Sequence, residues 1–235
     1  MRAADTITIP SRFNGPRDSG NGGYAAGLLA RHVGGIAEVS LRSPVPLDVG
    51  LRVETGGDGS VRLLEGETLV AEARAVPAID VEVPAPVSPA EAREAAARYA
   101  GLADGPFSDC FVCGRTRADA IGVFAGPVAG RDLVASPWTP AAQAAGDAVS
   151  SELVSAVLDC PTYFALYDDP ATLSFLARHA VRIDGPIRAG EEHVVIAWPI
   201  AFDGRKHHAG AAVLDAQGGT LAVARALLIA ARDEA

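Results

Sequence analysis

Residues 41–50, LRSPVPLDVG, organise the chain, because residues 181–190, VRIDGPIRAG, repeat their pattern. Each stretch begins with an apolar residue and an arginine and continues, after the same interval, as Pro-apolar-x-x-Gly. Two further pairs match in the same order: residues 66–69 with 218–221, and residues 73–75 with 224–226 after a one-residue slip. Short matches of common residues can arise by chance, but several in one order favour an internal duplication.

The residues around each repeat predict a β-rich half with one helix near its start. Alternating apolar runs between Gly and Pro residues are typical of strands. In the first half we expect a helix over Tyr24–His32 and strands over Thr6–Pro10, Ile36–Ser43, Leu51–Thr55, Ser60–Leu64 and Thr68–Val76. In the second half we expect strands over Ile121–Gly126, Asp132–Pro137, Ala177–Asp184, His193–Phe202, His207–Asp215 and Thr220–Ala230. The helix of this half runs from Ser150 to about Tyr167, and Pro161 should kink or break it.

The segment between the halves has a different composition. Residues 77–88 are rich in Pro and small side chains, which predicts an extended linker. Ser88-Pro89-Ala90-Glu91 then has the residues of a capping box with proline at the first helical position. A short helix should follow and end at Gly101.

Composition narrows the classes of function. The chain has 235 residues, a formal net charge of −9 and 49% hydrophobic residues, which is enough for a packed core. The acidic balance argues against a nucleic-acid or anionic-membrane partner, because phosphate binding needs clustered Lys and Arg. No segment reaches the roughly 18 apolar residues of a membrane span, and Met1–Pro10 has no signal-peptide pattern. With three cysteines, an odd and low number, we expect a cytoplasmic protein without disulfides.

Two motifs resemble a known family. The loop-helix start SGNGGY at residues 19–24 and the strand-turn Arg42…Pro46-x-x-x-Gly50 resemble the hotdog fold, and more narrowly the TesB-like double-hotdog acyl-CoA thioesterases. The segments CFVCG at 110–114 and LDCP at 158–161 resemble uncharacterised thioesterase-like proteins of actinobacterial type. The resemblance implies an α+β tandem hotdog, in which each unit is a central helix wrapped by a curved antiparallel sheet. The units would span residues 1–85 and 106–235, with a linker and short helix over 86–105.

The first candidate site is Asn21-Gly22-Gly23-Tyr24, which stands directly before the first helix. The first N–H groups of a helix lack intrahelical partners and carry the positive end of its dipole. They are therefore suited to hold the oxyanion formed from a thioester carbonyl, and the resemblance gives Asn-Gly-Gly this role. The alternative is an ordinary glycine-rich loop in which Asn21 caps the helix.

The second candidate is Asp159 on the helix that begins at Ser150. Glu152, Ser155 and Asp159 form one polar stripe on this helix, which could simply face solvent. The central helix of a hotdog is largely covered, and burial would raise the pKa of Asp159 and suit it to act as general base or nucleophile. The resemblance also implies an acidic residue in this helix. Glu152 remains open between a partner of the helix dipole and a site residue.

An ungapped comparison of the two helices makes the candidates complementary. Gly22 is followed eight positions later by Ala30, whereas Ser151 is followed eight positions later by Asp159. The first half therefore keeps the glycines without the acid, and the second keeps the acid without the glycines. Together they would form one composite site, with its pseudo-symmetric twin disabled.

The chain departs from the TesB-like pattern at other site positions. Such enzymes are expected to add a Gln and a Thr or Ser that hold the attacking water. The Gln position lies near Ala226–Leu228, which is apolar, and no hydroxyl falls cleanly at the other position, near Phe175–His179. We take Thr162, Tyr163, Arg178 and His179 as candidate substitutes, with Tyr24, Glu152, Ser155, Thr162, Tyr163 and His179 as candidate substrate-binding residues.

The cysteines are interpreted as structural thiols. Cys110-x-x-Cys113 suggests zinc or redox chemistry, but a structural zinc needs four ligands and the chain has no second cysteine pair. A redox Cys-x-x-Cys usually opens a helix, whereas a strand-like run follows here. Cys160 is expected to be a small core residue. We therefore expect neither a metal nor a cofactor.

These observations favour hydrolysis of an acyl-CoA or acyl-carrier thioester, in which Asp159 activates water or attacks the carbonyl. A non-catalytic protein that binds acyl or aromatic ligands on the same fold is the second hypothesis, favoured by the missing Gln. A MaoC-type hydratase is the third, although its Asp-x-x-x-x-His dyad is absent from the start of either helix. The partner would be a small acyl thioester, and a homodimer of such chains remains open.

Overall fold

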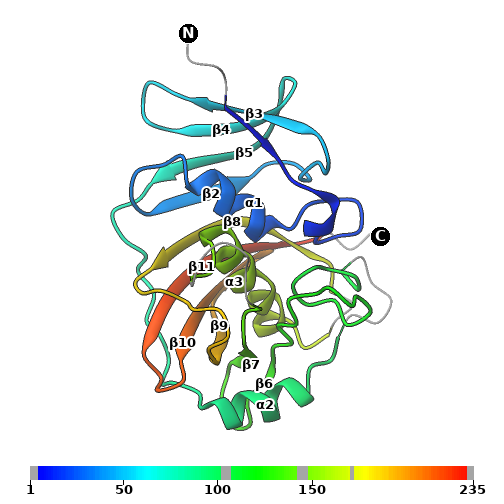
Figure 1. Ribbon diagram of the computed structural model, residues 1–235, viewed down its shortest axis with the longest axis vertical. Coiled ribbons are helices and arrows are strands. Elements are labelled where there is room, and N and C mark those ends of the chain that lie inside the picture. The colour runs from blue at the N-terminus through cyan, green and yellow to red at the C-terminus, as the bar shows by residue number, and fades with distance from the viewer. Residues whose placement is uncertain (1–4, 102–106, 142–147, 170–171, 232–235) are drawn as a thin grey trace.

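The computed structural model (Figure 1) describes residues 5–101, 107–141, 148–169 and 172–231. The first half contains β1 (Asp5–Thr8), the 3-10 helix η1 (Ser11–Phe13), α1 (Gly22–Ala30), β2 (Ala37–Leu41), β3 (Gly50–Thr55), β4 (Val61–Glu65) and β5 (Thr68–Ala75). The remainder contains α2 (Pro89–Ala97), β6 (Gly126–Pro127), β7 (Val134–Trp138), α3 (Ser151–Leu166), β8 (Ser174–Ile183), β9 (His193–Asp203), β10 (Lys206–Asp215) and β11 (Thr220–Ala230).

The strands of the described residues form one 11-stranded antiparallel sheet in the order β1-β3-β4-β5-β2-β8-β11-β10-β9-β7-β6. Every strand from the first half lies on one side of the β2–β8 pair, and every strand from the second half lies on the other. At this seam Val39 of β2 is opposite His179 of β8. The two halves are therefore joined edge to edge into a single sheet.

Helices α1 and α3 lie against each other in front of this sheet (Figure 1). They approach closely because α1 presents Gly23 and Gly27 to α3. A Cβ atom at Gly23 would lie 2.5 Å from the Cβ of Asp159, and one at Gly27 would lie 2.5 Å from the Cα of Glu152. Gly23 thus faces the later part of α3 and Gly27 its start, so the helices run antiparallel.

The other face of the sheet is covered by α2 and the segment before it. Along β9, Val195 and Ala197 belong to the core that includes α3, whereas Val194 and Ile196 pack with Ala92 of α2 on the opposite face. Residues 77–88, expected as an extended linker, contribute the buried side chains of Ile79 and Val87 to this second core. The proposed linker range 86–105 includes residues 102–106, which lie outside the described residues.

One expected strand is wrong, and of the two outcomes expected at Pro161, a kink or a break, the break does not occur. Residues 121–125 form no strand, because the amides of Ile121, Gly122 and Val123 bond back to the carbonyls of Phe111 and Val112 instead of joining the sheet. Helix α3 is not broken at Pro161 and continues to Leu166. Ten of its residues are buried, so tertiary packing compensates for the backbone hydrogen bond that proline removes. None of the described helices is long and apolar enough to cross a membrane.

Candidate active site

Asp159 of α3 contacts the start of α1. Its Oδ2 accepts a hydrogen bond of 2.9 Å from the Gly23 amide, so the acid and the glycines come from different halves of the chain. Its residual exposure is 9%. Burial raises the pKa of Asp159 to about 7, and the Gly23 amide and the Asn21 side chain oppose this rise. At neutral pH the carboxyl can therefore both accept and return a proton.

Asn21 is the N-cap of α1, as the second interpretation of the motif expected. Its Oδ1 accepts a 2.8 Å hydrogen bond from the Tyr24 amide, which leaves its Nδ2 facing the Cys160 sulfur at 3.7 Å. The amides of Gly23 and Tyr24 thus already serve Asp159 and Asn21. Gly22 is the first residue of α1, so its amide has no acceptor within the helix, and it borders the cleft described below.

A cleft of about 960 Å³ opens between the two halves. Much of its wall is aromatic or aliphatic, which suits an acyl chain or an aromatic acyl group. Its apolar side chains include Leu41, Val45, Phe107, Phe164, Phe175, Leu176 and Leu228. Asp159 is the buried carboxylate of this cleft.

The candidate site residues separate into two groups. Asn21, Gly22, Asp159 and Tyr163 line the cleft, and Gly23, which does not, bonds to Asp159 through its amide. The remaining candidate substrate-binding residues are not among the lining residues: Tyr24, Glu152, Ser155, Thr162 and His179. The candidate substitute Arg178 does not line the cleft either.

Three residues of the second group support the helix pair from behind. The Ser155 hydroxyl donates a 2.6 Å hydrogen bond to the Gly23 carbonyl, next to the amide that serves Asp159. The Thr162 hydroxyl donates to the backbone carbonyl of Asp159 at 2.6 Å. His179 is buried with Nε2 3.2 Å from the Ser155 carbonyl. These contacts position the acid and its amide partner.

The side chains of Glu152 and Tyr24 are engaged in other contacts. Glu152, at the start of α3, forms an ion pair with Arg31 at 3.7 Å. Tyr24 stacks on Phe13 with ring centroids 4.2 Å apart.

Burial lowers the pKa of His179 to about 4, so its imidazole is neutral at physiological pH.

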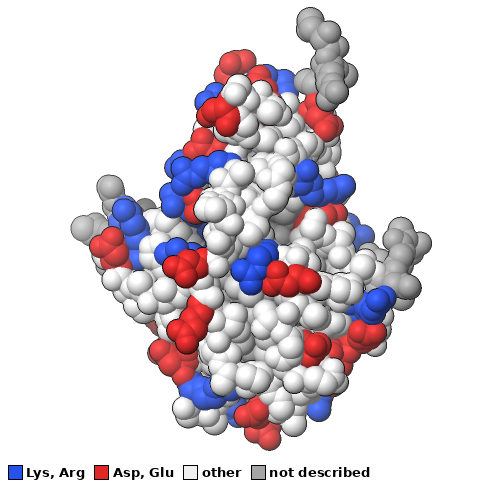
Figure 2. Space-filling model, turned by 90° about the vertical axis from the view of Figure 1, so that its left-hand side faces the viewer, with Lys and Arg blue, Asp and Glu red and all other residues white. Residues whose placement is uncertain are grey.

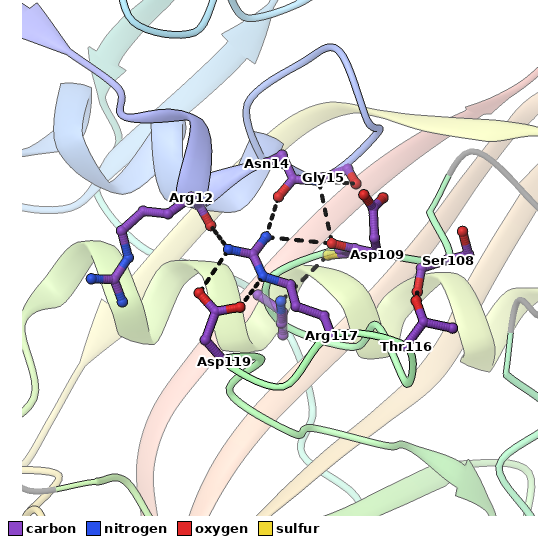
Figure 3. Close-up of polar contacts among 10 residues, drawn as sticks. Arg12, Asn14, Gly15, Ser108, Asp109, Thr116, Arg117 and Asp119 are labelled. Atoms are coloured by element: carbon purple, nitrogen blue, oxygen red, sulfur yellow. Dashed lines mark hydrogen bonds and ion pairs between the residues drawn. The ribbon is translucent and has the colours of Figure 1, made fainter.

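The loop that carries Cys110 and Cys113 is clamped onto the first half by Arg117 (Figure 3). The guanidinium donates to the carbonyls of Arg12 at 2.7 Å and Asp109 at 3.4 Å, and to the side chain of Asn14. Asp119 accepts from the same guanidinium at 3.0 Å. A planar five-donor group can bridge several acceptors in this way, so the loop is fixed against the cleft.

Sequence reasoning did not find two features of the cleft. All three cysteines line it, with the sulfurs of Cys110 and Cys160 3.6 Å apart. Arginines 17, 42 and 205 also line it. Arg42 is paired with Glu72, whereas Arg205 donates to the Ala230 carbonyl at 3.1 Å. The cysteines did have a signal in the sequence, namely the Cys-x-x-Cys motif and a cysteine beside the candidate acid. The arginines are scattered along the sequence, so no motif marked them.

Charge elsewhere does not form a basic surface on the visible face. Figure 2 shows arginines interspersed with carboxylates around a broad uncharged area. This distribution offers no continuous track for a phosphate backbone on that face.

No family model matches the chain, and no curated protein matches it. Solved structures match nearly its whole length. A conserved protein of unknown function with hot dog fold from Alicyclobacillus acidocaldarius is 10% identical, covers 99% of this chain and 95% of its own, and has a TM-score of 0.59. The chain has the hotdog fold.

TesB-type proteins share this fold with the chain. The tesB protein of Mycobacterium avium subs paratuberculosis is 13% identical, with 96% of this chain and 91% of its own covered and a TM-score of 0.60. The acyl-CoA thioesterase II TesB2 of Mycobacterium marinum is 11% identical, with 98% and 96% covered and a TM-score of 0.58. These matches confirm the structural resemblance to TesB-like proteins, and at such identity they concern fold alone.

Proposed function

We propose that the chain hydrolyses acyl thioesters of the coenzyme A type. The contact between Asp159 and the Gly23 amide, at a largely apolar cleft of about 960 Å³, carries this proposal. A buried acid beside a helix N-terminus supplies a base and a positive backbone end in one place. The names of the structural neighbours, which include acyl-CoA thioesterase II, support the same reaction.

The proposed architecture is a tandem of two hotdog units, over residues 1–85 and 106–235, with a linker and short helix over 86–105. The side-by-side arrangement of the two halves in the sheet supports it. The α1–α3 contact and the β2–β8 pair join the units, so a chain cleaved near residue 85 should remain one complex. Separation of the two pieces in gel filtration under native conditions would contradict this architecture.

In the proposed reaction, Asp159 takes a proton from water while the water oxygen attacks the thioester carbon. The negative charge that forms on the carbonyl oxygen is stabilised by the Gly22 amide and the positive end of the α1 dipole, which face the cleft. The carbon–sulfur bond then breaks, and Asp159 returns the proton to the leaving thiolate. The products are a carboxylic acid and a free thiol.

The arginines at the cleft support a phosphorylated carrier. Arg17 is 73% exposed in its side chain, and Arg205 is exposed at the β9–β10 turn. Both can reach solvent-borne phosphates while the acyl group lies among the apolar side chains. A guanidinium binds phosphate in bidentate geometry, so coenzyme A esters should bind more tightly than short thioesters that lack phosphates.

Hydrolysis of a panel of acyl-CoA esters, followed by release of free thiol, tests the function. Because a positioned general base contributes about 10²- to 10⁴-fold, Asp159→Asn should lower kcat by at least about 100-fold. Asp184→Asn makes the same change in an acid that pairs with Arg182 at the end of β8, and it should leave kcat unchanged. Turnover unaffected by Asp159→Asn would rule out this role, and hydration of an enoyl-CoA without thiol release would indicate a hydratase.

A non-catalytic acyl-binding protein is the second candidate. The buried side chains of Ala226 and Leu228 stand where a TesB-like enzyme is expected to place its Gln. Near Asp159, the hydroxyls of Ser155 and Thr162 bond to backbone carbonyls instead of the carboxylate. Tight binding of acyl-CoA without turnover at any chain length would favour this candidate.

A further inference from the structure

The cysteines of the cleft form a cluster that the proposed hydrolysis does not use. Cys110 and Cys160 are 50 positions apart in the sequence, yet their sulfurs lie 3.6 Å apart. The three sulfurs of Cys110, Cys113 and Cys160 all lie within 4.8 Å of one another. In the described part of the chain, they form a group of ligand atoms close enough to share one ion.

The spacing of the sulfurs fits a metal better than a disulfide. Zinc–sulfur bonds of about 2.3 Å in a tetrahedron place neighbouring sulfurs about 3.8 Å apart. The Cys110–Cys160 separation of 3.6 Å is close to this value. A disulfide requires about 2.05 Å. A shift of one sulfur by at most about 1 Å would bring the widest pair, which lies within 4.8 Å, to the tetrahedral separation.

Polar hydrogens are directed at two of these sulfurs. The Val112 amide donates to the Cys110 sulfur at 3.5 Å, and Nδ2 of Asn21 faces the Cys160 sulfur at 3.7 Å. Hydrogen bonds of this kind stabilise a thiolate, which is the form that binds metal. A cysteine that only fills space in a core needs no such donors.

The Cys-x-x-Cys turn is held rigid. The Gly114 amide donates to the Cys110 carbonyl at 2.8 Å, and a Cβ at position 114 would lie 2.6 Å from the same carbonyl oxygen. The Tyr99 hydroxyl donates to the Cys113 carbonyl at 2.9 Å. With Arg117 clamping the loop, these contacts orient both thiols before any ion arrives. Preorganisation reduces the conformational entropy lost on binding.

We propose that Cys110, Cys113 and Cys160 bind one zinc ion, with a fourth position open to the cleft. Structural zinc sites have four protein ligands, whereas sites with three keep a position for an exogenous ligand. All three cysteines line the cleft, so such a ligand can enter from there. Binding three thiolates releases the thiol protons to solvent. Its three ligands are distinct from the residues assigned to the proposed hydrolysis, although both groups line the same cleft.

Metal analysis of the full-length protein tests the proposal without any substrate. Protein purified with reductant and without chelator should retain one zinc per chain. After chelation, the three cysteines of the protein should become reactive towards a thiol reagent. Cobalt added to the chelated protein should produce thiolate-to-cobalt charge-transfer absorption. Reduced protein that takes up neither zinc nor cobalt would overturn the proposal, as would a Cys110–Cys160 disulfide found by mass spectrometry under anaerobic handling.

Substitutions separate the ligands from their surroundings. Cys160→Ser should lower the affinity for zinc by at least about tenfold, whereas Asp184→Asn, outside the cleft at the end of β8, should retain wild-type affinity. Far-ultraviolet circular dichroism reports whether each variant folds. If Cys160→Ser is unfolded, the thiol accessibility of wild type with and without zinc decides the question instead. Wild-type affinity in folded Cys160→Ser would also overturn the assignment.

Discussion

Replacing Gly27 by alanine should separate the two helices that bring Asp159 to its amide partner. The new Cβ would lie 2.5 Å from Glu152 Cα and 2.9 Å from Ser155 Cβ, where ordinary contacts begin at 3.4 Å. The nearest atom belongs to the backbone and cannot rotate away. Helix α3 must therefore move by about 1 Å relative to α1 for the usual packing distances to be restored.

The expected size of the effect combines two opposing terms. Overpacking of a core costs about 1–3 kcal/mol, and a glycine-to-alanine change inside a helix returns about 1 kcal/mol. We expect a net loss of about 1 kcal/mol, which lowers Tm by roughly 2–4 °C in a chain of this size. The 2.9 Å hydrogen bond between Gly23 and Asp159 crosses the same interface and should be broken by a shift of this size. Under the proposed function, kcat should fall by about 100-fold.

Thermal unfolding and acyl-CoA hydrolysis measure the two effects separately. Gly34→Ala is the control, because a Cβ at position 34 meets nothing within 4 Å. The separation of the helices would be refuted by a Gly27→Ala protein at least as stable as wild type. If stability falls while kcat stays at the wild-type value, the Gly23–Asp159 contact does not position the catalytic acid.

Three further predictions concern other parts of the molecule. Burial keeps the pKa of His179 at about 4, against about 6.5 in the unfolded chain. The contribution of His179 to the free energy of unfolding is therefore complete above pH 6.5 and decreases by roughly 3 kcal/mol as the pH falls to 4. Urea unfolding should show this loss in wild type relative to His179→Gln, and parallel pH profiles of the two proteins would disprove it. Arg205→Ala should raise KM several-fold for acyl-CoA at low salt without changing it for thioesters that lack phosphates; an equal change for both would exclude a phosphate contact. Arg117→Lys should lower the free energy of unfolding by about 1–3 kcal/mol, because lysine cannot reproduce hydrogen bonds to three acceptors on two separate segments. An unchanged urea midpoint would contradict the clamp shown in Figure 3.

The local elements were predictable because their signals lie within a few neighbouring residues. Alternation and turn residues located β3, β4 and β5 to within one or two positions, and the capping box at Ser88 marked the start of α2. Residues 121–125 were mistaken for a strand because apolar composition does not specify a backbone partner, and the Phe111–Val112 carbonyls provide one only in the folded chain.

The sequence by itself determined the β-rich halves, the glycine motif before α1 and the presence of an acid in α3. The burial of Asp159, the occupation of the Gly23 amide by its carboxylate and the gathering of three thiols were decided by tertiary structure. The physical reason is distance along the chain. The Gly23–Asp159 contact joins residues 136 positions apart, and Cys160 is 47 and 50 positions from the other two cysteines. No periodicity or local propensity encodes the direction in which packed segments bring such distant groups together.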